Sequence, residues 1–333
     1  MSQITQTSQK IDIRPLFGLG HVPSPVYLDG YAEPGPDTPE GSADYVWQRG
    51  HIQDMVTFFR SGEIALQAIG HAGTGKSSFI EEFHNRLNLP LYTYNAHPRT
   101  EAGDLIGKYA PTPSGGLVFV FGPVARAAME GRSVLIDEYN VIDPGEATGL
   151  NALLEGRSVF IPEIGDWIRP KPGFRIFTTI NPRTVGYVGR NTQDAANDDR
   201  FRFMYFDYMP EDQEISLIKS VLLSAGMKDE ATAISTATCY REVAAAVRKA
   251  YMGVSDDAAA LDVTLSTRSL VRWAKYAMAC AGVSNSGFGP VHYALERSKT
   301  LKASPETRMA IHEMVHQVFG EEYRTPLTQS LTA

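Results

Sequence analysis

Short β-rich apolar runs alternate with amphipathic segments through the middle of the chain. The runs are EIALQAIG, LPLYTYNA, SVLIDEYN, FRIFTTINP and FRFMYFDYM, and helical patterns such as HIQDMVTFFRS and SSFIEEFHNRL separate them. Strands that alternate with helices are typical of a parallel sheet with helices on both faces. We therefore expect residues 46–208 to form an α/β domain built on a parallel sheet.

The pattern changes on either side of this region. From Pro210 onwards, apolar residues recur three and four positions apart, as in EDQEISLIKSVLLSA and STRSLVRWAKYAMACAG, which places them on one face of a helix. We expect a smaller helical domain over residues 209–333. Residues 1–45 hold one apolar island, IDIRPLFGL, before the loop-forming segment EPGPDTPEGS, and we interpret them as an N-terminal arm.

Composition and charge narrow the class of protein. With 333 residues, of which 43% are hydrophobic, the chain can bury a sizeable core, and its net charge of −7 argues against nucleic acid as a partner. Its two cysteines, Cys239 and Cys280, lack C-x-x-C spacing and indicate neither a disulfide framework nor a thiolate metal site. Neither a signal peptide nor an apolar run of about 18 residues is found, so we expect a cytoplasmic protein without a membrane span.

The strongest chemical signal is the segment IGHAGTGKSSF. Gly70, Gly75, Lys76 and Ser77 fit G-x-x-x-x-G-K-[ST] between an apolar strand and an amphipathic helix. Such a loop wraps backbone N–H groups around a polyphosphate, its lysine binds the outer phosphates and its serine ligates Mg²⁺, so we predict ATP and Mg²⁺ as cofactors. A glycine-rich turn that carries a lysine by chance is the alternative. The predicted nucleotide-binding residues are Gly70, His71, Ala72, Gly73, Thr74, Gly75, Lys76, Ser77 and Ser78, together with Asp137.

Two carboxylates follow directly on the apolar run RSVLI. Asp137 and Glu138 would lie at the carboxyl edge of a buried strand, where open α/β sheets bind their ligands. We predict that Asp137 holds Mg²⁺ through water and that Glu138 orients and deprotonates the attacking water, which indicates hydrolysis and not binding alone. The alternative is a strand that ends in a solvated acidic turn.

Further candidates follow the next strand. Asn181 in TTINP would position water near the γ-phosphate, although an Asn-Pro pair at a strand end is usually a turn. Beyond a predicted short helix, Arg200 and Arg202 in DDRFRF are candidates for an arginine finger that reaches the nucleotide of a neighbouring subunit. Surface salt bridging is the alternative for both arginines.

The order GHAGTGKSS, LIDEYN, TTINP, DDRF and LSTRSLVRW resembles the AAA+ ATPases, in particular the MoxR-like group of the helix-two-insert clade. DLIGKYAPTPSGGLVFVFGPVARAAMEG is similar to that clade's second helix with its inserted β-hairpin, which would have Gly115 and Gly116 at its tip. GRSVFIPEIGDWIRPKPGF is similar to the second hairpin, which in such rings lines the pore or touches the client. The resemblance implies a P-loop AAA+ core followed by a small all-α lid domain.

Within this family, the chain is most similar to the AAA+ subunits of aerobic cobaltochelatases, through IDIRPLFGL, VPSPVY, DLIGK, IDEYN and the C-terminal FGEE. The resemblance implies a head-to-tail ring, expected to be a hexamer, and a sensor-two role for Arg268, for which a helix-surface arginine is the alternative. It also implies a partner with a von Willebrand A domain and a large chelatase subunit, with ATP turnover driving cobalt insertion into a corrin ring. Asn181–Pro182 departs from those subunits and matches activases of other metalloenzymes, which leaves the client open. A machine that acts on nucleic acid is a further alternative.

One motif competes with this interpretation. His312, Glu313 and His316 spell H-E-x-x-H, the spacing of zinc peptidases. The extended metzincin form needs glycine at 319 and histidine at 322, where the chain has Phe319 and Glu322. We therefore predict that this segment is a lid helix.

Overall fold

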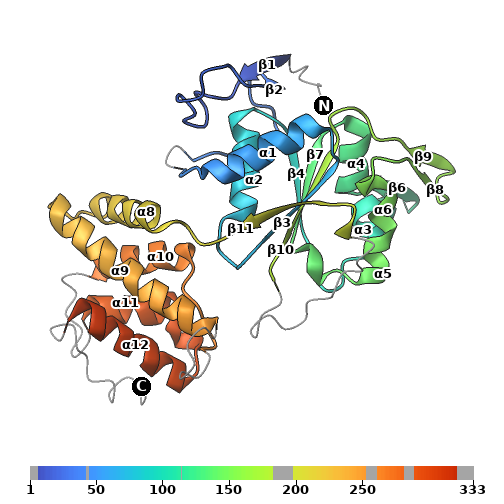
Figure 1. Ribbon diagram of the computed structural model, residues 1–333. Helices are drawn as coiled ribbons and strands as arrows, with labels where there is room; N and C mark the ends of the chain where they lie inside the picture. The colour runs from blue at the N-terminus through green and yellow to red at the C-terminus, as the bar shows by residue number, and fades with distance from the viewer. Residues whose placement is uncertain are drawn as a thin grey trace. The chain divides into compact units, whose positions relative to one another are not determined.

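The computed structural model describes residues 7–42, 45–113, 115–182, 198–252, 261–280 and 289–320. The chain divides into two compact units, one made mainly of residues up to Phe206 and the other mainly of residues from Asp207 onwards. Figure 1 shows the first as a sheet with helices and the second as helices alone. No helix among the described elements combines the length and the apolar character that crossing a bilayer requires.

A five-stranded parallel sheet is the centre of the first unit, which confirms the predicted fold class. Its strand order is β11-β3-β10-β7-β4, so the P-loop strand β3 lies between β11 and β10. Because all neighbours are parallel, the carboxyl ends of the strands lie at one edge of the sheet. The strands are β3 (Ala65–Gly70), β4 (Leu91–Asn95), β7 (Ser133–Asp137), β10 (Arg175–Ile180) and β11 (Arg202–Phe206).

Helices cover both faces of this sheet (Figure 1). Successive strand residues point to opposite faces, so Leu135 and Phe177 pack with α1 (Arg49–Ser61) and α2 (Lys76–Arg86). Their neighbours along the strands face a second core that includes α4 (Pro123–Glu130). This burial on both faces explains why the strands read as continuous apolar runs. Shorter helices on that side are α3 (Ala102–Ile106), α5 (Pro144–Ala147), α6 (Asn151–Leu154), η1 (Tyr139–Val141) and η2 (Thr148–Leu150).

Two antiparallel hairpins project from the helical connections, and both were predicted. The first pairs β5 (Gly107–Pro111) with β6 (Leu117–Phe121), and the second pairs β8 (Val159–Ile161) with β9 (Asp166–Ile168). The Tyr109 hydroxyl of the first donates to the Glu163 carbonyl of the second at 2.6 Å, so the hairpins contact each other.

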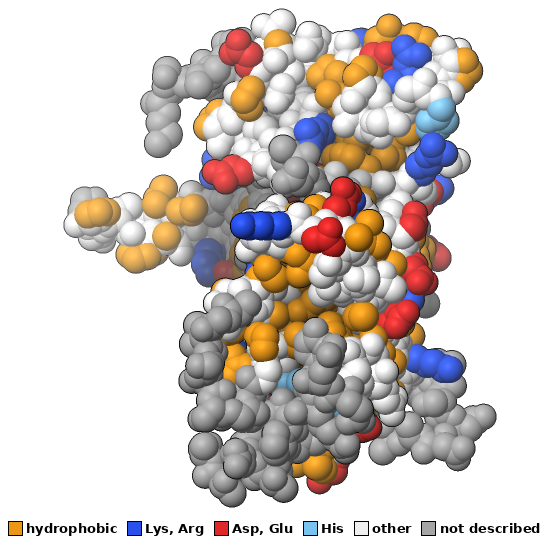
Figure 2. All heavy atoms as spheres, turned by 90° about the vertical axis from the view of Figure 1, so that its left-hand side faces the viewer, with side chains coloured by type: hydrophobic (Ala, Val, Ile, Leu, Met, Phe, Trp, Pro, Cys, Tyr) orange, Lys and Arg blue, Asp and Glu red, His pale blue; other side chains and the backbone are white. Residues whose placement is uncertain are grey.

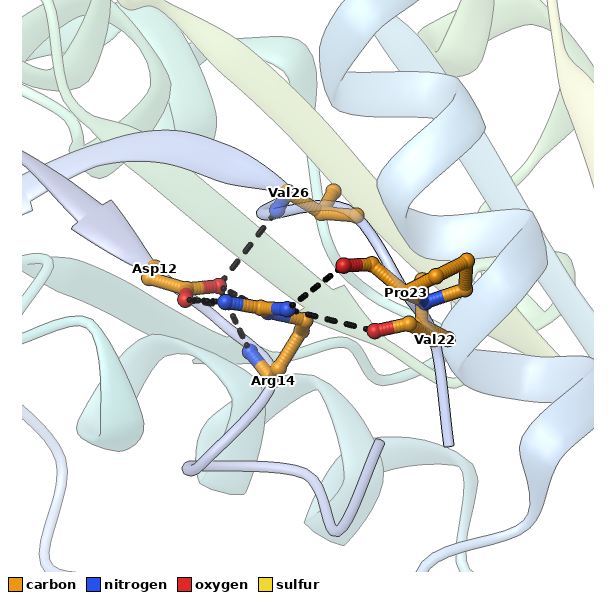
Figure 3. Close-up of polar contacts among 5 residues, drawn as sticks. All are labelled: Asp12, Arg14, Val22, Pro23 and Val26. Carbon is orange, nitrogen blue, oxygen red and sulfur yellow. Dashed lines mark hydrogen bonds and ion pairs between the residues drawn. The ribbon is translucent and has the colours of Figure 1, made fainter. Parts of the chain in front are cut away.

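The N-terminal region packs onto the α/β unit. Strands β1 (Ser8–Asp12) and β2 (Tyr27–Tyr31) pair antiparallel, and the Phe17 ring stacks on Phe83 of α2 with ring centroids 5.0 Å apart. The sequence predicted neither strand. In the connection, the Arg14 guanidinium donates to the Asp12 carboxylate at 2.8 Å and to a carbonyl of the following turn, as Figure 3 shows. This ion pair lowers the pKa of Asp12 and ties the loop to the strand before it.

The second unit is helical, as predicted. Its core surrounds Trp273, whose ring is fully buried and donates from Nε1 to the Val291 carbonyl at 2.8 Å. The segments EDQEISLIKSVLLSA and STRSLVRWAKYAMACAG and the predicted lid helix each contain a helix of this unit. The helices are α8 (Glu211–Ser224), α9 (Glu230–Tyr251), α10 (Thr267–Cys280), α11 (Pro290–Ser298), η3 (Thr300–Lys302) and α12 (Pro305–Phe319).

Candidate functional site

The P-loop leaves β3 at Gly70 and enters α2 at Lys76. Gly73 and Gly75 have φ of +78° and +90°, in the left-handed region where a Cβ is strained. A Cβ on Gly70 would lie 2.1 Å from the Phe206 carbonyl oxygen of β11. The motif's glycines are therefore required by the backbone path and by strand packing. Of the other predicted residues, His71, Ala72 and Thr74 lie in the loop and Ser78 lies in the first turn of α2.

The Lys76 ammonium lies at the junction of two strand ends. It donates to the carbonyls of Gly70 and His71 at 2.7 and 2.9 Å and to Asn181 Oδ1 at 2.8 Å. Lys76 and Asn181 are buried, with 7% and 5% of their surface exposed. Two residues predicted separately, 105 positions apart, are thus in direct contact. A phosphate placed here would meet the lysine and the asparagine together.

Ser77 and Asp137, which were both predicted as Mg²⁺ ligands, also contact each other. The Ser77 hydroxyl donates to Asp137 Oδ1 at 2.9 Å, and the Thr179 hydroxyl donates to the same oxygen. Thr179 was missed, although a hydroxyl in the buried strand FRIFTTI is a signal that a polar partner lies nearby. The hydroxyl of Ser77 and the carboxylate of Asp137 are hard oxygen donors, and this donor set fits Mg²⁺.

Glu138 occupies an unusual backbone position beside this group. Its φ and ψ are 58° and 36°, in the left-handed region that non-glycine residues rarely adopt. Its backbone N–H donates to Thr179 Oγ1 at 3.0 Å, and its side chain is exposed. The turn therefore presents the carboxylate to solvent next to the half-buried Asp137, where an attacking water would be.

Two further side chains lie around the site: one stabilises its backbone through a hydrogen bond, and the pKa of the other responds to its charge. The Asn140 amide, which the sequence did not single out, donates to the Asn181 carbonyl at 3.0 Å and joins the turn after β7 to the end of β10. Burial raises the pKa of Glu81 on α2, and the charge of Asp137 raises it further. The negative charge of Asp137, which contributes to this raised pKa, also favours a cation beside it.

Arg200 lies at the other edge of the sheet. Arg200 precedes β11, and in the pairing of β11 with β3, Arg202 is opposite Leu66 near the amino end of β3. The P-loop, in contrast, follows Gly70 at the carboxyl end of β3. At about 3.3 Å per residue, Arg200 lies roughly 20 Å from that end of β3. Its Nε donates to Glu155 Oε1 at 2.7 Å, so an ion pair holds it, and the exposed Arg202 lies on β11 itself. The predicted short helix before Arg200 lies largely outside the described residues.

Arg268 belongs to the helical unit. It is the second residue of α10, it is exposed, and it forms no ion pair with any residue that the structure describes. Its guanidinium is therefore available to an anionic ligand.

The H-E-x-x-H segment forms part of α12. His312 and His316 point into the helical core toward His292 of α11, with 2.6 Å between the Nδ1 atoms of His292 and His312, whereas Glu313 is exposed. Within the described residues, no group of three or more His, Cys, Asp or Glu side chains could hold a metal ion. The helical packing supports the lid-helix prediction over the peptidase alternative; Glu322 lies outside the described residues.

This histidine cluster makes stability depend on pH. Burial, followed by the charges of His292, Arg308 and His316, lowers the pKa of His312 to about 3 from its ordinary 6.5. The unfolded chain then binds the proton more tightly, so the contribution of His312 to stability is fully present above pH 6.5 and is lost as the pH drops toward 3.

We expect the urea midpoint of unfolding to fall between pH 7.5 and 5, and to fall less in His312→Gln. His21→Gln, at an exposed position, is the control; an equal decline in all three proteins would contradict the assignment.

Two sequence families match this chain. The family described as AAA domain (dynein-related subfamily) matches residues 68–201, which contain the P-loop, the acidic pair and Arg200. The family described as CbbQ/NirQ/NorQ C-terminal matches residues 227–318 of the helical unit.

Individual relatives match over different lengths. The aerobic cobaltochelatase subunit CobS of Sinorhizobium sp is 25% identical over 94% of this chain and 92% of its own length. The denitrification regulatory protein NirQ of Stutzerimonas stutzeri is 27% identical over 75% of this chain and 83% of its own. Midasin of Giardia intestinalis is 31% identical over 50% of this chain, and the matched region spans 4% of midasin.

Proposed function

Because the chain belongs to the MoxR-like AAA+ ATPases, we propose that it is a Mg²⁺-dependent ring-forming motor that remodels a partner complex and drives cobalt insertion into a corrin ring. The observation that carries the ATPase part is the contact of Lys76 with Asn181 beside the Ser77–Asp137 pair. These contacts bring an ammonium, an amide, a hydroxyl and a carboxylate together at one edge of the sheet, which supports the proposal.

The chain's own residues divide the chemistry among them. Lys76 binds the outer phosphates, and Asn181, oriented by Lys76 and Asn140, positions the attacking water. Ser77 and Asp137 would hold Mg²⁺, which when bound neutralises phosphate charge. Glu138 accepts a proton from the water, because its carboxylate is exposed beside the site.

A complete catalytic site requires a residue from a neighbouring subunit. Arg200 lies at the opposite edge of the sheet from its own P-loop, so it can act as a finger only on another subunit's nucleotide. When every subunit gives an arginine and receives one, the contacts are heterologous, and we propose that the rotation between subunits closes them into a hexameric ring. Arg268 contacts a nucleotide phosphate from the helical lid and links the state of the nucleotide to the lid position.

Mixing two inactive variants tests the ring. Lys76→Ala removes the phosphate contact and Arg200→Ala removes the finger, so each is expected to lose ATPase activity alone. In an equal mixture, about a quarter of the interfaces pair an intact P-loop with an intact arginine, and phosphate release should recover accordingly. Arg202→Ala is the matched control and should remain active alone. A mixture that stays inactive would refute catalysis in trans by Arg200.

The likeness to the cobaltochelatase subunit CobS along almost the whole chain supports cobalt insertion. We further propose that a chelatase subunit and a von Willebrand A domain protein are its partners in the cytoplasm. The CbbQ/NirQ/NorQ C-terminal match and Asn181–Pro182 favour a second candidate, activation of another metalloenzyme. A nucleic-acid machine has less support, because the net charge of the chain is −7. On the face in Figure 2, Lys and Arg lie among Asp and Glu.

Affinity capture with a Glu138→Gln trap, loaded with ATP, separates these clients. Recovery of a von Willebrand A domain protein with a chelatase subunit is expected. Capture of another metalloenzyme would replace cobalt insertion by the second candidate, and strong stimulation of the wild-type ATPase by DNA would favour the nucleic-acid machine.

A further inference from the structure

A buried ion pair joins two helices of the helical unit. Arg248 of α9 donates from Nη1 and Nη2 to both carboxylate oxygens of Glu214 on α8, each at 2.8 Å. The Arg248 and Glu214 side chains are 7% and 0% exposed, and the guanidinium carbon lies 4.0 Å from the centroid of the Tyr208 ring. Burying two charges is costly unless their remaining hydrogen-bonding groups also find partners.

Those remaining groups are used at the start of α10. The Thr267 hydroxyl donates to Glu214 Oε1 at 2.6 Å, and Arg248 Nε donates to the Leu265 carbonyl at 2.7 Å. Between these two anchored residues, the Ser266 hydroxyl accepts from the Ser269 backbone N–H at 3.2 Å. The ion pair thus binds the Leu265 carbonyl and the Thr267 hydroxyl, on either side of Ser266, which caps the helix.

Arg268 follows these anchors directly. It is exposed and has no ion-pair partner among the described residues, so its own side chain does not fix its direction. A long side chain at a helix start is aimed by the backbone that carries it, and a misplacement of about 1 Å at a reacting group reduces the rate strongly. The position of Arg268 consequently depends on the anchors at Leu265 and Thr267.

We infer that Glu214 and Arg248, acting through Thr267, are positioning residues that hold the first turn of α10 so that Arg268 meets the nucleotide phosphate. The inference rests on the proposed sensor role of Arg268. The positioning role can be tested separately from stabilisation of the helical unit, because the Thr267 hydroxyl can be removed while the bidentate ion pair of Arg248 and Glu214 stays in place.

The test uses variants that differ in one hydroxyl. Thr267→Val keeps the side-chain volume and loses the bond to Glu214, and we expect kcat for ATP hydrolysis to fall about tenfold because Arg268 is then misplaced. Thr267→Ser keeps the hydroxyl and should restore the wild-type kcat. Thr267→Ala is a second variant without the hydroxyl, in case valine disturbs the helix start. Thermal unfolding of each protein checks that the fold is kept.

Combining Thr267→Val with Arg268→Ala distinguishes failure of the positioning inference from failure of the proposed sensor role. If Thr267 acts through Arg268, the double variant Thr267→Val/Arg268→Ala should be no slower than Arg268→Ala alone. If Arg268→Ala lowers kcat but neither Thr267→Val nor Thr267→Ala does, or if the effects multiply in the double variant, the positioning inference is overturned and the sensor role stands. If Arg268→Ala leaves both kcat and KM unchanged, the sensor role fails and the inference fails with it.

Discussion

Glu138→Gln is expected to lower kcat for ATP hydrolysis by about 100-fold or more while ATP still binds. The amide has the shape of the carboxylate but cannot accept a proton from water. The turn should be kept, because the contact of residue 138 with Thr179 is made by its backbone N–H at 3.0 Å. Phosphate release measures the loss, and titration with a fluorescent ATP analogue measures binding, which Lys76 and Ser77 should preserve.

Glu313→Gln is the matched control for this experiment. It makes the same chemical change at an exposed position of the H-E-x-x-H segment, and it should leave ATP hydrolysis unchanged. Hydrolysis at the wild-type rate in Glu138→Gln would show that another group activates the water. A protease activity abolished by Glu313→Gln would reopen the peptidase alternative.

Arg248→Met is expected to destabilise the helical unit by about 3–5 kcal/mol, because it leaves the Glu214 carboxylate buried without its cation. Arg248→Met combined with Glu214→Leu should recover most of this loss, since neither charge is then buried alone. Denaturant unfolding of the full chain measures both effects through the midpoint and slope of the transition that reports the helical unit.

Arg241→Met provides the comparison within the same two helices. Arg241 of α9 pairs with Glu211 of α8 at 3.0 Å, but the two side chains are 24% and 58% exposed. An exposed pair contributes less than about 1 kcal/mol, so this variant should unfold close to the wild type. Equal effects of Arg248→Met and Arg241→Met would contradict a special role of burial.

The P-loop and the strand ends were predictable because they depend on local sequence. The apolar runs specify buried strands, the glycines at 73 and 75 suit left-handed backbone, and Asp137 and Asn181 follow the strands directly. Both hairpins were also predictable from paired β-rich runs around turns. Thr179 and Asn140 were missed, since their roles arise from strand pairing and turn geometry that bring them to Asp137 and Asn181.

The N-terminal strands and the histidine cluster show the same limit. Pairing of β1 with β2 joins segments with weak strand patterns, and packing against Phe83 helps stabilise the pair. The spacing of His312 and His316 puts them on one face of α12, and this arrangement is compatible both with a zinc site and with a packed core. The absence of the extended metzincin residues already favoured a lid helix, and the position of His292 and the exposure of Glu313 support the packed core.

By itself, the sequence predicted the parallel α/β unit and the helical unit and indicated the residues that we propose bind and hydrolyse ATP, because hydrophobic period, glycine placement and strand ends act over a few neighbouring residues. The tertiary structure alone decided which distant groups meet. Lys76 reaches Asn181, Arg200 lies away from its own P-loop, and Glu214 and Arg248 hold the start of α10. Such contacts depend on strand order and helix packing, and no local pattern encodes which partners those will bring together.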